Sequence, residues 1–222
     1  MTDATNEMRY DAHNQDQREL TDTLRRDARI VRNVKDEWIL LGHDEVVEAA
    51  TNAEVFSSQV SAHLQLPNGL DGDEHQQFRA LIDRYLTHER MVDLEPHVVE
   101  VAEAVVAEVP AGEEIDAVAI GTKFAVHAMT RWLGWPASMH DALTQWVQDN
   151  HLASASGDRE ATARVAADCD ALITSVIEPR RADPSIDDVT AELMRDDYLG
   201  RPLTDDEIVS ILRNWTGGDL GS

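Results

Sequence analysis

From Glu74 onward the sequence is a succession of helical patterns separated by turn residues, and this feature constrains the fold most. Apolar residues recur at spacings of three and four, the period at which one face of an α-helix can be buried. Glycine and proline stand at the edges of the periodic segments, where helices end. The pattern predicts helices at residues 74–87, 89–108, 115–133, 137–151, 158–179 and 187–196, and from 204 onward.

The first part of the chain has a different pattern. Two short runs with strand character, 28–34 and 38–41, are separated by three polar residues, which predicts a hairpin. We also expect a frayed polar start at 1–17, short helices at 18–27 and 43–50, and a long irregular loop at 56–73. The predicted fold class is mainly α with a small N-terminal β-sheet. The predicted organisation is a polar segment with a short helix at 1–27, followed by a single domain at 28–222.

Charge and apolar content limit the classes of function. The chain has 43 acidic and 19 basic residues and a formal charge of -24, whereas sequence-independent binding to nucleic acid needs clustered cations. No apolar run approaches the roughly 20 residues of a membrane span, and the polar start lacks the pattern of a secretory signal. We therefore expect a cytoplasmic protein that binds neither nucleic acid nor membrane. A single cysteine excludes an internal disulfide.

The segment DGDEHQQFR places His75 and Arg79 four residues apart, on one face of a predicted helix. Two donors in this arrangement suit a bound carboxylate or phosphate. The plainer interpretation is a solvated helix start in which Arg79 pairs with Asp83, and spacing alone favours it. A metal site at Asp71 and Asp73 with His75 lacks a second His or Cys at ligand spacing, so we assign no metal ligand.

The last twenty residues, LTDDEIVSILRNWTGGDLGS, begin with a strong helix signal. Thr204 and Glu207 form the capping-box pattern, in which each side chain satisfies a free backbone N–H of the other residue. The apolar stripe that follows runs into Gly217 and Gly218. The spacing alone favours a helix end at Gly217, while the alternative is a helix that continues and lets a flat ligand approach beside Asp219.

The remaining candidates for chemistry carry no local signature of catalysis. Cys169 lies between two acidic residues, which disfavour a thiolate, so we expect a small packing residue. His127, His140 and His151 are scattered along predicted helices, and we expect helix-face or core roles for them. Neither a nucleophile arrangement nor a glycine-rich phosphate loop is present in the sequence.

Four segments together resemble the N-terminal half of a bacterial cytochrome P450. The first is WILLGHDEVVEAATNAEVFSS, which resembles the early hairpin and following helix of that family. LDGDEHQQFRALI resembles its DPPEHxxxR segment, and WLGWP resembles its LLGxP turn. EPRRADPSIDDVTAELM, followed by LTDDEI and TGGD, resembles the run into the long central helix. The order and spacing of the four carry the resemblance, which covers the chain from about Ala28 to its end.

The resemblance implies roles for individual residues. The matching His and Arg of the family bind the propionates of heme b, which implies the same for His75 and Arg79. The matching glycines, Gly217 and Gly218, would lie where the central helix passes close to the porphyrin and the substrate. The central helix would then continue through them.

The resemblance also implies an acidic proton-delivery residue, and this chain departs from the pattern beside it. Asp219 matches the acidic member of the AGx(D/E)T motif. Leu220 stands where the family usually has Thr, so the hydroxyl role is either absent or moved to Ser222. Both Asp219 and Ser222 are candidate catalytic residues.

The long loop would correspond to the substrate-facing loop of the family, with Val60, Leu64 and Leu66 as candidate pocket residues. The alternative is that these residues only pack the loop down. The axial cysteine segment and the ExxR pair of the family do not occur in this sequence, and Cys169 has no such context. The resemblance therefore implies a fragment that ends within the central helix and is inactive alone, whereas the parent protein would be active.

The activity that the resemblance implies for the parent is oxidation of a small organic molecule by a heme-thiolate monooxygenase. Electrons would come from a redox partner of the ferredoxin or reductase type. One alternative is a non-catalytic helical binding or interaction module derived from a P450. Another is a protein that binds a carboxylate or phosphate through His75 and Arg79 without heme.

Overall fold

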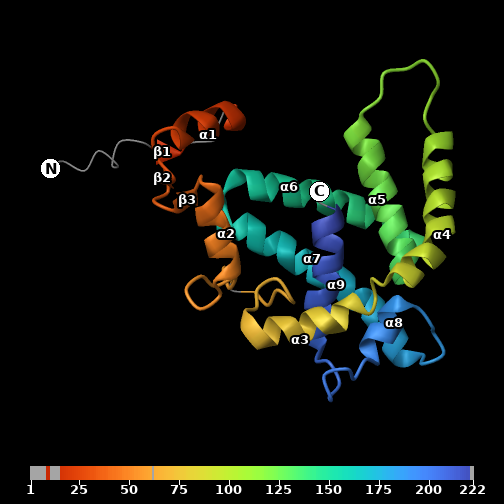
Figure 1. Cartoon of the computed structure of the whole chain (residues 1–222). Helices are drawn as coiled ribbons and strands as arrows, with labels where there is room; N and C mark the ends of the chain where they lie inside the picture. Colours follow the sequence, from red (N-terminus) through yellow and green to blue (C-terminus); the bar gives the residue numbers. More distant parts are fainter. Residues whose placement is uncertain (1–8, 11–15, 62, 221–222) are drawn as a thin grey trace. The chain divides into compact units, whose positions relative to one another are not determined.

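The computed structural model of the protein describes residues 9–10, 16–61 and 63–220. The chain divides into two compact units, Met1–Gln59 and Val60–Ser222. The predicted class, mainly α with a small N-terminal sheet, is confirmed (Figure 1). The predicted domain limits, 1–27 and 28–222, stay a prediction.

The first unit holds the sheet. Its elements are β1 (Arg9–Tyr10), α1 (Gln17–Arg25), β2 (Ile30–Asn33), β3 (Trp38–Leu40) and α2 (His43–Thr51). β2 and β3 form the predicted antiparallel hairpin, with Ile30 opposite Leu40. β1 pairs with β2 in parallel, which corrects the expectation that 1–17 is frayed throughout. A two-residue strand is too short to show an alternating pattern in the sequence.

Asn33 organises the turn of the hairpin. Its side-chain Oδ1 accepts hydrogen bonds from the backbone N–H groups of Lys35 and Glu37, both at 2.9 Å. Asp36 has a φ of 65°, a left-handed conformation that Asp tolerates better than most residues. Local polar chemistry therefore fixes the hairpin, and Leu24, Val31 and Leu41 form the small core of this unit.

The second unit is helical. Its elements are α3 (Gly72–Asp83), α4 (His88–Ala107), α5 (Ala117–Leu133), the short 3-10 helix η2 (Ala137–Met139), α6 (His140–Ser156), α7 (Arg159–Ala182), α8 (Val189–Met194) and α9 (Asp205–Leu220). α4 packs against α5, and α6 packs against α7 (Figure 1). α9 contacts α5, α7 and α8, so this last helix lies at the centre of the unit.

All the predicted helices are present, and their limits differ in ways that side chains explain. α3 ends at Asp83 rather than at 87, because Thr87 caps α4 by accepting from the Arg90 N–H at 3.5 Å. α6 extends to Ser156 and ends at Gly157, whose φ of 67° suits a left-handed cap. α7 continues through Pro179 to Ala182.

The core of the second unit is built around α9. Leu81, Leu133, Ile211 and Leu212 are fully buried. The ring of Trp215 on α9 lies 5.3 Å from that of Tyr85 and 5.1 Å from that of Trp132, as measured between centroids. These tilted aromatic contacts join α5, α9 and the turn that follows α3. Within the described ranges, no helix has both the length and the apolar character needed to cross a membrane.

A buried ion pair fixes the turn after α5. The guanidinium of Arg180 donates to Asp188 Oδ2 at 2.6 Å and to the Gly134 carbonyl at 2.7 Å. The side chains of both ionic partners are largely buried. Because a buried charge is tolerated only when it is paired and hydrogen-bonded, this cluster sets the position of α7 and α8 against the end of α5.

Candidate functional site

α9 begins with the predicted capping box. The Thr204 N–H donates to Glu207 Oε2 at 2.8 Å, and the Glu207 N–H donates to Thr204 Oγ1 at 3.3 Å. Arg201 also pairs with Glu207, and its hydrogen bond is the main reason that the pKa of the Glu207 carboxyl is lowered. The start of α9 is therefore held by its own side chains, as the sequence predicts.

α9 does not end at its glycines. The helix continues through Gly217 and Gly218 to Leu220, so the left-handed cap that spacing alone favours at Gly217 is wrong. A Cβ built on Gly217 would lie 3.7 Å from Cη2 of Trp146 on α6. Because Gly217 has no side chain, nothing projects from the surface of α9 at this position. Asp219 lies in the last turn of α9, and Ser222 is outside the described residues.

Two polar side chains of α9 hold the loop that precedes α3. The Leu66 N–H donates to Ser210 Oγ at 2.9 Å, and that hydroxyl donates to the Leu64 carbonyl, also at 2.9 Å. Asn214 Nδ2 donates to the Leu66 carbonyl at 2.8 Å. Since these bonds reach the loop backbone from two successive turns on one face of α9, they fix the loop beside the helix.

A cavity of about 370 Å³ lies between this loop and helices α6, α7 and α9. The loop contributes Ser61, His63, Leu64, Gln65 and Asn68. The helices contribute Trp146, Asn150, Thr162, Ala166, Ser210, Arg213, Asn214 and Gly217. Its volume is at the small end of the range usual for ligand sites, roughly 300–1,000 Å³.

The structure brings some predicted site residues together and separates others. Leu64 and Gly217 line the same cavity. Val60 is 87% exposed, and Leu66 is 1% exposed within the hydrophobic core. Leu66 therefore packs the loop against the core, which is the alternative that the sequence left open. Leu64 instead lines the cavity.

His75 and Arg79 share one face of α3, as their spacing predicts. His75 is half-buried and Arg79 is exposed. Arg79 Nη2 lies 2.7 Å from Asp83 Oδ1, which is the local pair that the sequence also allowed. Neither His75 nor Arg79 is among the described residues that line the cavity. These two donors and the cavity are therefore separate features of the second unit.

Several cavity residues were not predicted from the sequence. No sequence motif marks three of them, which are Trp146 and Asn150 on α6 and Asn214 on α9. Ser210 is polar, yet only 2% of it is exposed. The available signal was the spacing of Ser210 and Asn214, four residues apart, which puts two hydrogen-bonding side chains on one face of a helix.

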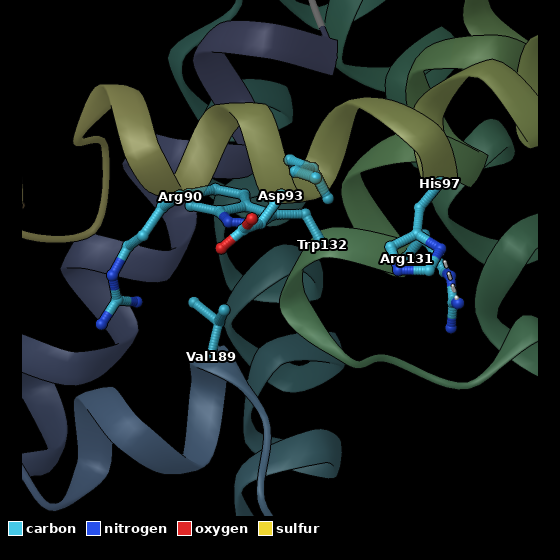
Figure 2. A pocket seen from close by; sticks show the side chains of 7 residues that line it. Arg90, Asp93, His97, Arg131, Trp132 and Val189 are labelled. Carbon is cyan, nitrogen blue, oxygen red and sulfur yellow. Dashed lines mark hydrogen bonds between the residues drawn. The ribbon is translucent and has the colours of Figure 1, made fainter.

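A second pocket, of about 300 Å³, lies among α4, α5 and α8 (Figure 2). Arg90 donates to both carboxylate oxygens of Glu192, at 2.9 and 2.5 Å. Figure 2 shows Arg131 meeting His97 at the other end, where Arg131 Nη2 lies 3.1 Å from His97 Nδ1. Asp93 also lines the pocket, so its charges are mixed and its two arginines already have partners.

The remaining reactive side chains have structural positions. Cys169 is 1% exposed, and burial followed by the nearby Asp170 carboxylate raises the pKa of its thiol to about 12. It is therefore a neutral packing residue, as predicted. The rings of His127 and His140 are stacked with centroids 3.8 Å apart. In the part of the chain that the structure describes, no group of three or more His, Cys, Asp or Glu could hold a metal ion.

The relatives found by sequence and by structure fall into one class of protein. No family model matches the chain. Cyclomarin C epoxidase CymV of Salinispora arenicola is 25% identical over 191 residues, which cover 78% of this chain and 48% of that protein. Cytochrome P450(MEG) of Priestia megaterium is 23% identical over 198 residues, which cover 78% of this chain and 47% of that protein. The crystal structure of cytochrome P450 CYP101C1 superposes with a TM-score of 0.78 and 26% identity, covering 96% of this chain and 55% of that one.

The class that this fold defines is the cytochrome P450. By fold and by sequence, the chain is similar to bacterial cytochromes P450. It spans about half the length of the curated relatives it matches, consistent with the N-terminal half of such a protein.

Proposed function

We propose that the parent protein, of which this chain corresponds to the N-terminal half, is a heme-dependent cytochrome P450 monooxygenase that oxidises a small organic molecule, and that this chain alone is inactive. The observation that carries this proposal is the similarity to P450 structures over nearly the whole chain, together with curated relatives that include an epoxidase and a hydroxylase/epoxidase. When bound, heme b would supply the oxidation chemistry, and a redox partner would supply electrons. A cytoplasmic location remains our expectation.

The residues of α3 fit the acidic groups of heme. An imidazole and a guanidinium on one helix face are a donor set for two carboxylates. Arg79 is exposed and pairs with an exposed neighbour on the same helix, so exchanging Asp83 for a propionate needs no change in the fold. We therefore assign His75 and Arg79 to the propionates.

The residues of α9 fit the other requirements of such a site. Gly217 and Gly218 leave the helix surface without side chains, which suits close approach of a flat ring. We assign these two glycines to the heme-facing surface and Asp219 to proton delivery. Ser222 is the candidate for the hydroxyl that Leu220, at the usual Thr position, does not provide. Leu64 and Val60 are assigned to substrate contact, and Leu66 supports them from the core.

The thiolate that would ligate iron is not supplied by this sequence. Its single cysteine is a buried core residue whose pKa is raised, so Cys169 cannot act as a ligand without unfolding α7 from the core. The second candidate is a non-catalytic helical binding or interaction module derived from a P450.

Heme binding tests the proposal. The heme-loaded parent protein, which would include the cysteine segment that this sequence lacks, should show the red-shifted Soret band of a thiolate-ligated ferrous carbonyl complex, and failure to show it would exclude the monooxygenase. Replacing His75 and Arg79 together by alanine should weaken hemin binding by at least about tenfold, because two charge-assisted contacts are lost. Arg164→Gln, an exposed arginine on α7, is the matched control and should leave hemin binding unchanged. Equal binding by the double variant and the control would reject the propionate assignment.

A further inference from the structure

The charge of the α9 cavity differs from that of the chain around it. The sequence has 43 acidic and 19 basic residues, so carboxylates dominate its surface. Among the described residues that line this cavity there is no Asp or Glu, and Arg213 is its one permanently charged side chain. The lining therefore lacks the attraction for cations that the rest of the surface has. Its single positive charge is partly offset by Asp170, which pairs with Arg213 through Nε alone and leaves the other nitrogens of the guanidinium for an anion.

Arg213 has hydrogen-bonding capacity left over. Its side chain is only 20% exposed, and its Nε lies 3.1 Å from Asp170 Oδ1. A guanidinium has five N–H donors, and within the described structure neither terminal nitrogen of Arg213 donates a hydrogen bond. Neither terminal nitrogen is among the buried unpaired side-chain atoms of the described structure, so both remain accessible to a ligand that brings an acceptor.

The rest of the cavity offers an apolar surface. Trp146 is 7% exposed, and its Nε1 already donates to the Val165 carbonyl at 2.9 Å, so only the ring carbons remain for a ligand. Leu64 and Ala166 lie on the same lining, and Gly217 adds no side chain. A small apolar ring or chain fits this surface within about 370 Å³.

We propose that the cavity selects a small amphipathic carboxylate, with its carboxylate at the Arg213 guanidinium and its apolar part against Trp146. This rests on the proposed function in that the ligand is the substrate of that reaction. Ser210 and Asn214 are positioning residues for the site, since they hold the loop that carries Leu64.

Three probes of equal skeleton and different charge test the proposal: phenylbutyrate, phenylbutyramide and phenylbutylamine. Each is titrated into the full-length protein by calorimetry at one ionic strength. We expect phenylbutyrate to bind at least about tenfold more tightly than the amide, the ratio typical of one charge-assisted contact, and the amine to bind weakest. Amide binding as tight as carboxylate binding, or binding of none of the three, would overturn the proposal.

Variants locate the contact. Arg213→Gln should reduce the preference for phenylbutyrate over phenylbutyramide to near unity, while Arg164→Gln removes the same charge from an exposed site on α7 and should preserve it. If Arg213→Gln fails to fold, Asn150→Asp decides the matter. This near-isosteric change adds a carboxylate to the lining, so it should weaken phenylbutyrate and leave the amide unchanged. An unchanged preference in the folded variant would reject the assignment.

The outcome is separable from that of the proposed function. The carbonyl spectrum and hemin titration test the heme site, whereas the charge series tests only the cavity. A protein with the expected spectrum but no carboxylate preference would retain the proposed function and lose this inference. A protein without the spectrum but with an Arg213-dependent preference would keep the carboxylate site and lose the monooxygenase.

Discussion

Gly134 has two separate reasons to be glycine. Its φ is 76°, the left-handed conformation that ends α5, and a Cβ at this position would lie 2.4 Å from the Cβ of Asp188. Asp188 cannot retreat freely because it holds the buried Arg180 guanidinium. Backbone conformation and buried charge are therefore coupled at one residue.

Gly134→Ala should destabilise the fold more than a glycine replacement that carries only conformational strain. Gly200 has the same φ of 76°, and among the described residues nothing lies within 4 Å of the position that a Cβ would take there, so Gly200→Ala is the matched control. We expect about 1 kcal/mol for the control and about 2–4 kcal/mol for Gly134→Ala, from strain plus overpacking. Urea unfolding measures both, and equal losses would show that Asp188 moves aside at no cost.

At the scale of elements, the contact between α5 and the start of α6 contains two stacked histidines. The pKa of His127 is lowered mainly by burial and next by the charge of Lys123. The pKa of His140 is also lowered mainly by burial, and next by His127. Glu108 and Asp141 oppose these effects. Thr130 Oγ1 lies 2.9 Å from His140 Nε2. The contact is therefore built for two neutral imidazoles.

This contact should lose stability as the pH falls. Because the folded pKa values lie below the usual value of about 6.5, the unfolded chain takes up protons first, and protonation favours unfolding below about pH 7. Between pH 7.5 and 5.5 we expect the free energy of unfolding to fall with a slope under about 1 kcal/mol per pH unit, since half-buried groups are partly screened. His127→Gln should flatten the slope in urea titrations, whereas the exposed His88→Gln should not. An unchanged slope in His127→Gln would contradict the prediction.

The helices could be predicted from the sequence because their signals are local. The capping box of Thr204 and Glu207 spans one turn, and the packing role of Cys169 follows from its neighbours. The cavity could not be predicted in the same way. The hydrogen bond that holds its wall joins residues 144 positions apart, and neither Leu66 nor Ser210 carries a sequence pattern that names the other. The glycine pair shows the same limit, because its spacing suits a helix end although α9 continues through it to Leu220.

At the scale of the whole molecule, carboxylates far outnumber the basic side chains that could neutralise them. With 43 acidic and 19 basic residues, at least 24 carboxylates lack a basic partner even if every cation is paired (43 − 19 = 24). Most of the ion pairs are exposed, as in Arg181 with Asp205, and such pairs contribute little. Self-repulsion should therefore outweigh surface pairing in the electrostatic part of the stability.

Salt should consequently stabilise this chain. Raising sodium chloride from about 0.05 to about 0.5 M shortens the screening length to a few ångströms, which weakens repulsion between the many unpaired carboxylates more than it weakens contact pairs. We expect the thermal midpoint to rise by a few degrees, the change produced by about 1 kcal/mol in a chain of this size. Glu113→Lys with Glu114→Lys replaces two negative charges by two positive ones in an exposed segment, so the double variant should show a smaller rise. A midpoint that falls with salt would show instead that the exposed ion pairs, few as they are, hold the fold together.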